Sequence, residues 1–196
     1  MQVIQVKCPN CRDPIYSKQK DMVFYCEKCG TLHERNGTAK VIDYEVADFN
    51  KETPEPKVFM PFWRIYATLK INHVSVAGGS MRKLRNWISG DENGGTVFVY
   101  VPATSLDKES FRRMAIDMTT APPQYRTRLD FAKLERLPTS ISKEEATRMA
   151  DFVLVTIEAE KSGVLQELDY TLTVHDARMV YIPFVRQTNG MTIALG

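Results

Sequence analysis

Alternating apolar and polar residues predict that β-strands make up most of this chain. In residues 64–76, Ile65, Ala67, Leu69 and Ile71 fall on one face, as expected for a strand with one buried side. Alternation, or a run of β-branched and aromatic residues, predicts further strands at 2–7, 22–25, 95–101, 152–160, 166–174 and 178–185, and a short one within 41–49. We expect these strands to form a mainly antiparallel sheet.

Two stretches have the spacing of an amphipathic helix instead. Apolar residues recur at i, i+3, i+4 and i+7 at Phe111, Met114, Ala115 and Met118, and again at Ala146, Met149, Ala150 and Val153. Ser142 and Glu145 form a capping box at the start of the second stretch. Strands together with about two helices predict the α+β class.

An apolar and aromatic segment that contains a proline occurs three times, at Val58–Trp63, Val99–Ala103 and Val180–Phe184. Proline cannot donate a hydrogen bond to a strand ladder, so we expect each copy at a strand end, an edge or a bulge. We interpret the copies as related β-units that arose from an old duplication. Chance recurrence of aromatic strands is the alternative.

The chain's four cysteines form two Cys-x-x-Cys pairs, Cys8 with Cys11 and Cys26 with Cys29, separated by fourteen residues. Two such turns can supply the four corners of a zinc tetrahedron. Gly30 follows the second pair, where a tight turn needs a positive φ, whereas Arg12 fits the matching place less well. A redox pair and two disulfides are the alternative interpretations.

This segment, Cys-Pro-Asn-Cys followed by Cys-Glu-Lys-Cys-Gly, resembles the zinc-ribbon family over about a sixth of the chain. The resemblance implies a metal site on a small antiparallel sheet, and it implies no particular function. A ribbon followed by aromatic-proline strands is also loosely similar to small bacterial zinc-ribbon proteins of unknown function.

A structural Zn²⁺ is expected at this site rather than a catalytic one, because four thiolates leave no open position for water. His33 lies four residues beyond Cys29. It is a candidate fifth ligand, but a solvated side chain or a hydrogen-bond donor to a thiolate fits better.

We predict three parts: a zinc ribbon at 1–37, a connector at 38–57 and a β-rich α+β domain at 58–196. Asn36–Gly37, a turn signal, immediately precedes the connector, and two prolines near the connector's end are a linker signal. No secretory signal precedes the cysteines, which indicates a cytoplasmic protein whose thiols stay reduced. The apolar runs are too short to span a membrane, and peripheral contact with a membrane protein or surface stays open.

Two segments have residues suited to partner binding. Between Gly78 and Gly95, a short basic helix would present Arg82, Lys83, Arg85 and Trp87. Its alternative is a hairpin insertion that folds back on the sheet. In Thr119–Arg128, the side chains of Tyr125, Arg126 and Arg128 could stack on bases and bind phosphates, or could cap the preceding helix.

The chain has no recognisable catalytic motif. The leading hypothesis is therefore a non-enzymatic zinc-binding module for protein interaction or scaffolding, within a larger assembly. The alternative is a nucleic-acid-binding zinc-ribbon protein, although the charge gradient from a mildly basic N-terminal part to a mildly acidic C-terminal part is too shallow to require such a partner. An enzyme whose site residues are distant in the sequence is the third hypothesis.

Overall fold

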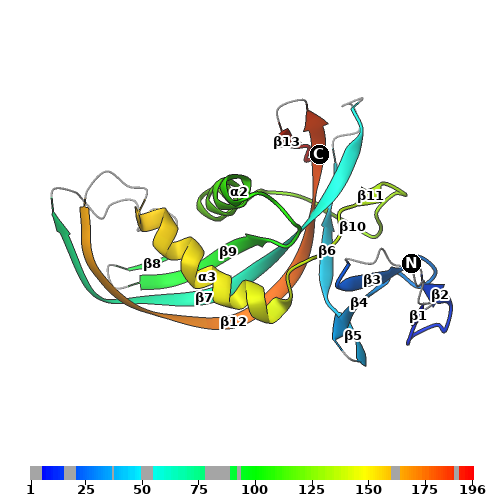
Figure 1. Ribbon diagram of the computed structural model, residues 1–196, viewed down its shortest axis with the longest axis horizontal. Coiled ribbons are helices and arrows are strands. Elements are labelled where there is room, and N and C mark those ends of the chain that lie inside the picture. The colour runs from blue at the N-terminus through cyan, green and yellow to red at the C-terminus, as the bar shows by residue number, and fades with distance from the viewer. Residues whose placement is uncertain are drawn as a thin grey trace.

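Two long antiparallel strands, β7 (Lys57–Ala77) and β12 (Val164–Gln187), form the centre of the computed structural model (Figure 1). The structure describes residues 6–15, 21–36, 38–49, 55–77, 89–91, 94–159, 164–187 and 190–196. The eight-stranded sheet around this pair is mostly antiparallel, and the described residues also include two helices. The predicted α+β class is therefore confirmed.

The strand order along the main sheet is β10-β6-β12-β7-β9-β8, and off this path β11 pairs with β7 and β13 pairs with β12. β6 (Tyr44–Ala47) pairs with β12 in parallel, and β11 (Glu135–Arg136) pairs with β7 in parallel. The other neighbours are antiparallel: β8 (Ser89–Asp91), β9 (Gly94–Pro102), β10 (Thr127–Arg128) and β13 (Gly190–Ile193).

The predicted strands at 166–174 and 178–185 are one continuous strand, β12. A register shift between Val174 and Asp176 lies at the predicted break. A β-bulge bends a strand and changes which side chains face the core without ending the ladder. The alternation of apolar and polar residues is therefore interrupted at this point, although the pairing of β12 with β7 continues.

The three prolines lie where the partner of a strand changes. Pro61 comes just before the residues that pair with β9, and its carbonyl accepts from the Ala103 amide at 2.9 Å. Pro102 ends β9, and Pro183 lies between the β12 residues that pair with β6 and those that pair with β13. Only Pro102, at a strand end, meets the expectation; Pro61 and Pro183 lie inside β7 and β12, away from the register shifts of that pair. A missing amide hydrogen is tolerated there because the partner on one side of the strand changes. The duplication itself stays a prediction.

The two helices are α2 (Lys108–Thr120) and α3 (Lys143–Ala159), and α3 lies across one face of the sheet (Figure 1). The capping interaction at Ser142 is present, because its hydroxyl accepts from the Glu145 amide at 3.1 Å. The strand predicted at 152–160 is wrong, since α3 continues to Ala159. The helical stripe decides the structure: Ala146, Ala150, Val153, Leu154 and Ile157 are buried.

The N-terminal strands form two small sheets beside the main one. β1 (Val6–Lys7) pairs with β2 (Pro14–Ile15), and β3 (Val23–Cys26), β4 (Thr31–Asn36) and β5 (Thr38–Ile42) form a three-stranded sheet. The predicted connector therefore contains β5, in the small sheet, and β6, in the main sheet. The boundaries at 37 and 57 stay a prediction. Among the described residues, no helix has the length and apolar character needed to cross a membrane.

Candidate metal centre

Two backbone turns of matching geometry carry the four cysteines. The Arg12 amide donates to the Cys8 carbonyl and the Gly30 amide donates to the Cys26 carbonyl, each at 2.8 Å. Arg12 and Gly30 both adopt positive φ, at 63° and 65°. The expected tight turn at Gly30 is present, and Arg12 takes the same left-handed conformation in spite of its Cβ.

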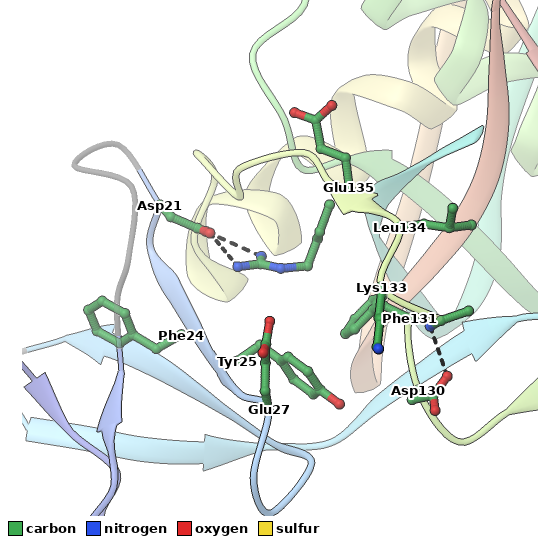
Figure 2. Close-up of a pocket in the computed structure, with 11 residues that line it drawn as sticks. Asp21, Phe24, Tyr25, Glu27, Asp130, Phe131, Lys133, Leu134 and Glu135 are labelled. Atoms are coloured by element: carbon green, nitrogen blue, oxygen red, sulfur yellow. Dashed lines mark hydrogen bonds and ion pairs between the residues drawn. The ribbon is translucent and has the colours of Figure 1, made fainter. Parts of the chain in front are cut away.

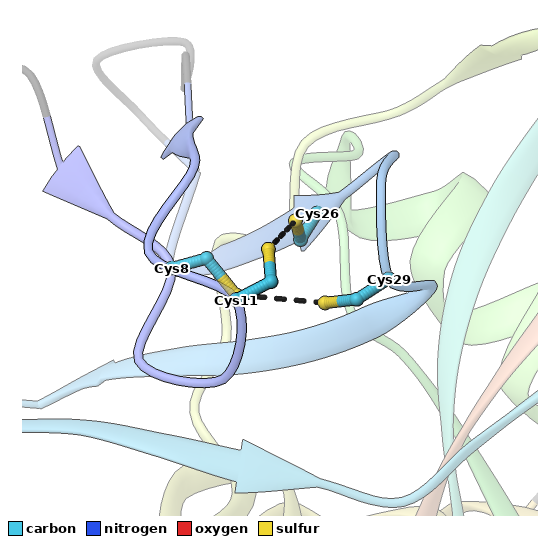
Figure 3. Close-up of side chains that lie close together, drawn as sticks. All are labelled: Cys8, Cys11, Cys26 and Cys29. Atoms are coloured by element: carbon cyan, nitrogen blue, oxygen red, sulfur yellow. Dashed lines mark hydrogen bonds between the residues drawn. The ribbon is translucent and has the colours of Figure 1, made fainter.

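These turns bring all four sulfur atoms together (Figure 3). The Cys8 and Cys29 Sγ atoms are 3.6 Å apart, the Cys11 and Cys26 Sγ atoms are 3.5 Å apart, and all four lie within 4.8 Å of one another. A tetrahedron with metal–sulfur bonds of about 2.3 Å has edges of about 3.8 Å. The four free cysteines therefore lie within metal-binding distance and supply a complete set of thiolate ligands.

The pKa values of Cys29 and Cys11 are shifted in opposite directions. A hydrogen bond with the Thr31 hydroxyl, at 2.9 Å, is the main cause that lowers the pKa of Cys29 to about 6. A backbone hydrogen bond from Asp13 lowers the pKa of Cys11, but burial and the other thiols together raise it to about 12. Four thiols within 4.8 Å of one another can release their protons on binding one divalent cation, so the donor set fits a divalent metal ion.

His33 contacts the cluster from β4. Its side chain is fully buried, and its Nε2 lies 3.4 Å from the Cys8 Sγ. Burial contradicts the expectation of a solvated side chain, and the contact matches a hydrogen-bond donor to a thiolate. Desolvation lowers the pKa of His33, so the neutral ring is favoured and can donate through Nε2. Such donors orient metal ligands from outside the coordination sphere.

A pocket of about 700 Å³ lies where β3 meets the segment 130–136 (Figure 2). At this seam, Arg136 donates to the Asp21 carboxylate at 2.5 Å and to the Tyr181 hydroxyl at 3.2 Å. Asp21 also accepts from the Thr139 amide at 2.9 Å. These partly buried contacts fix the sheet of β3, β4 and β5 against the main sheet.

The residues predicted to bind partners have different outcomes. Arg82, Lys83, Arg85 and Trp87 lie outside the described residues. Tyr125 is half-buried, and its hydroxyl contacts Glu45 and Arg64 at 3.0 and 2.9 Å. Arg128 forms an ion pair with Asp48 at 3.1 Å, whereas Arg126 is exposed. Tyr125 and Arg128 are thus held by contacts within the chain, and the use of the segment by a partner stays a prediction.

A groove between α2 and α3 is a feature that the sequence analysis missed. It has a volume of about 510 Å³ and is lined mainly by apolar side chains, among them Leu106, Phe111, Ile141, Met149 and Phe152. Phe152 is 58% exposed, and it lies in the stretch 152–160 for which alternation predicts a strand. The signal was available, because the buried stripe of α3 leaves position 152 outside the core. The charged side chains that line the groove are Lys108 and Arg112.

In comparisons with protein-family models, curated proteins and solved structures, nothing matched this chain.

Proposed function

We propose that this chain is a non-enzymatic zinc-binding module that binds a protein partner within a larger assembly. Zinc is the metal that four cysteine thiolates at ribbon spacing best suit, because it accepts tetrahedral sulfur ligation without redox chemistry. A closed thiolate shell supports folding rather than catalysis. Reduced thiolates also favour a cytoplasmic location.

The observation that carries the interaction proposal is the apolar groove between α2 and α3. An exposed phenylalanine on the rim of an apolar groove is typical of a surface that a partner covers. Met149 adds an adaptable side chain to the groove wall. The positive charge of Lys108 favours an acidic group at the rim. The groove therefore suits an amphipathic helix whose apolar face is flanked by Asp or Glu.

Native mass spectrometry of the protein purified gently from its own cells tests this proposal. We expect a mass that exceeds the chain by one zinc ion, together with a second polypeptide. Replacing Phe152 with Ser should remove the polypeptide and leave the zinc, because the side chain is largely exposed and its loss does not disturb the core.

Val155→Ser is the matched control, since Val155 lies on the same helix, is 39% exposed and does not line the groove. Retention of the polypeptide by the Phe152 variant would exclude the groove as its binding site. A preparation without zinc, from cells grown with adequate zinc, would contradict the metal assignment.

A further inference from the structure

One half of the main sheet has a face that none of the described helices or strands covers. In this half, Ile65, Ala67 and Leu69 of β7 are buried in the core that includes α3. The alternate positions, Arg64, Tyr66, Thr68 and Lys70, therefore point to the opposite side. Figure 1 shows α3 across one face of β7, β9 and β12, with the other face open.

Three rings form a row across this open side, one from each of three adjacent strands. Tyr66 of β7 pairs with Phe98 of β9, and their ring centroids are 5.2 Å apart at an interplanar angle of 31°. On the other flank, the ring of His175 from β12 lies 5.4 Å from Tyr66. A hydrogen bond of 2.7 Å between the Thr68 hydroxyl and His175 Nε2 fixes that ring.

The exposure of this row goes beyond what strand pairing requires. Cross-strand aromatic pairs stabilise a sheet, and that effect alone would account for the contact between Tyr66 and Phe98. Phe98, however, is 46% exposed, whereas its neighbours on β9, Val97 and Val99, face the core and are buried. A large apolar ring held in water by a rigid sheet is ready to stack on a planar ligand.

Basic side chains surround the row. The Arg64 guanidinium lies 5.7 Å from the centroid of Phe98 and shares the Glu45 carboxylate with Arg178. Two guanidinium groups beside one carboxylate leave a net positive charge there. Further along β7, Lys70 is exposed, and Asp169 is an acidic group on the same side, hydrogen-bonded to Asn72.

We propose that this ring face, formed by Arg64, Tyr66, Thr68, Lys70, Phe98, His175 and Arg178, binds single-stranded nucleic acid. Unpaired bases would stack on Phe98, Tyr66 and His175, and Arg178 and Lys70 would contact the phosphates. A duplex keeps its bases stacked internally, so it cannot use the rings in this way. The ring face is separate from the α2–α3 groove, and this activity goes beyond the proposed protein interaction.

Fluorescence anisotropy with labelled oligothymidylate and oligouridylate tests the proposal on the full zinc-loaded chain. A blunt duplex of the same length serves as the comparison. We expect the single strands to bind more tightly than the duplex, and the affinity to fall as salt rises. For two phosphate contacts, log K should change with log salt with a slope of about −1.4.

The discriminating variant is Phe98→Leu, which keeps an apolar side chain on β9 but removes the π face. It should weaken single-strand binding roughly 5- to 100-fold, whereas Phe98→Trp should bind at least as tightly as the parent. Val155→Ala is the control, because it trims an exposed apolar side chain on α3 that belongs to neither surface, and its binding should be unchanged. Thermal unfolding of each variant would show whether a loss reflects misfolding.

Several results would overturn the proposal. They are failure of both single strands to bind at low salt, equal affinity for the duplex, and full binding by a folded Phe98→Leu protein. A salt-independent affinity for a neutral polysaccharide, with none for the oligonucleotides, would instead assign the rings to sugar stacking.

Discussion

Glu45 is a carboxylate that accepts hydrogen bonds from three different side chains. It accepts two hydrogen bonds from Arg64, at 2.8 and 3.0 Å, one from Tyr125 and one from Arg178. Burial alone would raise its pKa, but the hydrogen bonds from these donors outweigh burial and bring the pKa below its ordinary value of 4.5. A depressed carboxyl pKa means that the ionised form stabilises the fold.

Glu45→Gln should therefore lower the free energy of unfolding by about 1–3 kcal/mol at neutral pH. The contribution of Glu45 is fully present above pH 4.5 and is lost as pH falls through its lower folded pKa. Urea unfolding of parent and variant at a series of pH values measures the difference, which should shrink in acid. Glu135→Gln serves as the control, since its ion pair with Arg186 is about half exposed and contributes little. A difference that does not depend on pH would refute this role.

The contact between His33 and Cys8 predicts a second residue-scale effect. His33→Phe keeps a ring in the buried site but removes the nitrogen that donates to the thiolate. Zinc affinity should fall about 10- to 100-fold, as measured by competition with a chromogenic chelator. His175→Phe, far from the cysteines, should leave the affinity unchanged. Equal affinities for parent and His33→Phe would show that His33 only fills space.

At this scale the sequence predicted the parts of the site that are local. The spacing of the cysteines and the turn at Gly30 depend on a few neighbouring residues, and both have the expected geometry. The burial of His33 depends on the pairing of β4 with β3, and the charge cluster at Glu45 joins residues up to 133 positions apart. Such contacts are set by tertiary structure, which a local pattern does not encode.

At the scale of elements, Gly94 controls how β9 begins beside β7. Its φ is +136°, and a Cβ there would lie 2.0 Å from the Leu69 carbonyl oxygen. Gly190, at the start of β13, has a nearly identical φ of +138° but has no atom within 4 Å of a built Cβ. A comparison of substitutions at the two glycines therefore distinguishes the cost of an unfavourable φ, which both share, from the cost of a steric collision, which only Gly94 has.

Gly190→Ala should cost about 1–3 kcal/mol, from the unfavourable φ alone. Gly94→Ala should cost clearly more, because the Leu69 backbone must also move and the pairing of Gly94 with Lys70 would open. Thermal and urea unfolding of both variants measure the two costs. If they are equal, the backbone at Leu69 yields easily, and the close approach does not constrain the sheet.

Elements with two compatible patterns were the hardest to predict. Val153, Val155 and Ile157 alternate as in a strand, but Val153 and Ile157 also continue the helical stripe that begins at Ala146, and Val155 is exposed. The capped start at Ser142 favours the helix, since a helix once begun extends cooperatively. The long strand β12 was difficult for a different reason: its register shifts interrupt the alternation, so one strand has the sequence pattern of two.

At the scale of the whole molecule, the strand order could not be predicted from the sequence. β7 and β12 pair over almost their full length although about a hundred residues separate them, and β6 pairs with β12 in parallel. Composition and periodicity do support the α+β class, but they do not say which strands are neighbours. The same limit hid the ring face, whose rings come from three strands.

The sheet of β3, β4 and β5, which contains Cys26, shares a core with the main sheet. Val23 and Leu32 are buried in the same cluster as Phe59 and Trp63. The ion pair of Asp21 with Arg136 adds a polar contact at the seam. Metal binding should therefore stabilise more than the segment that supplies the ligands.

Zinc removal by a chelator should lower the stability of β7 as well as that of β4. At free zinc a thousandfold above the dissociation constant, binding contributes about 4 kcal/mol, and this is lost from every segment that unfolds cooperatively with the site. Hydrogen exchange with and without chelator measures protection at Leu32 and at Trp63, and Cys26→Ser should reproduce the metal-free result. Loss of protection at both positions would mean that the two sheets form one cooperative unit. Loss confined to residues before β6 would instead support an independent ribbon, in which the shared core forms only after the metal-bound segment has folded.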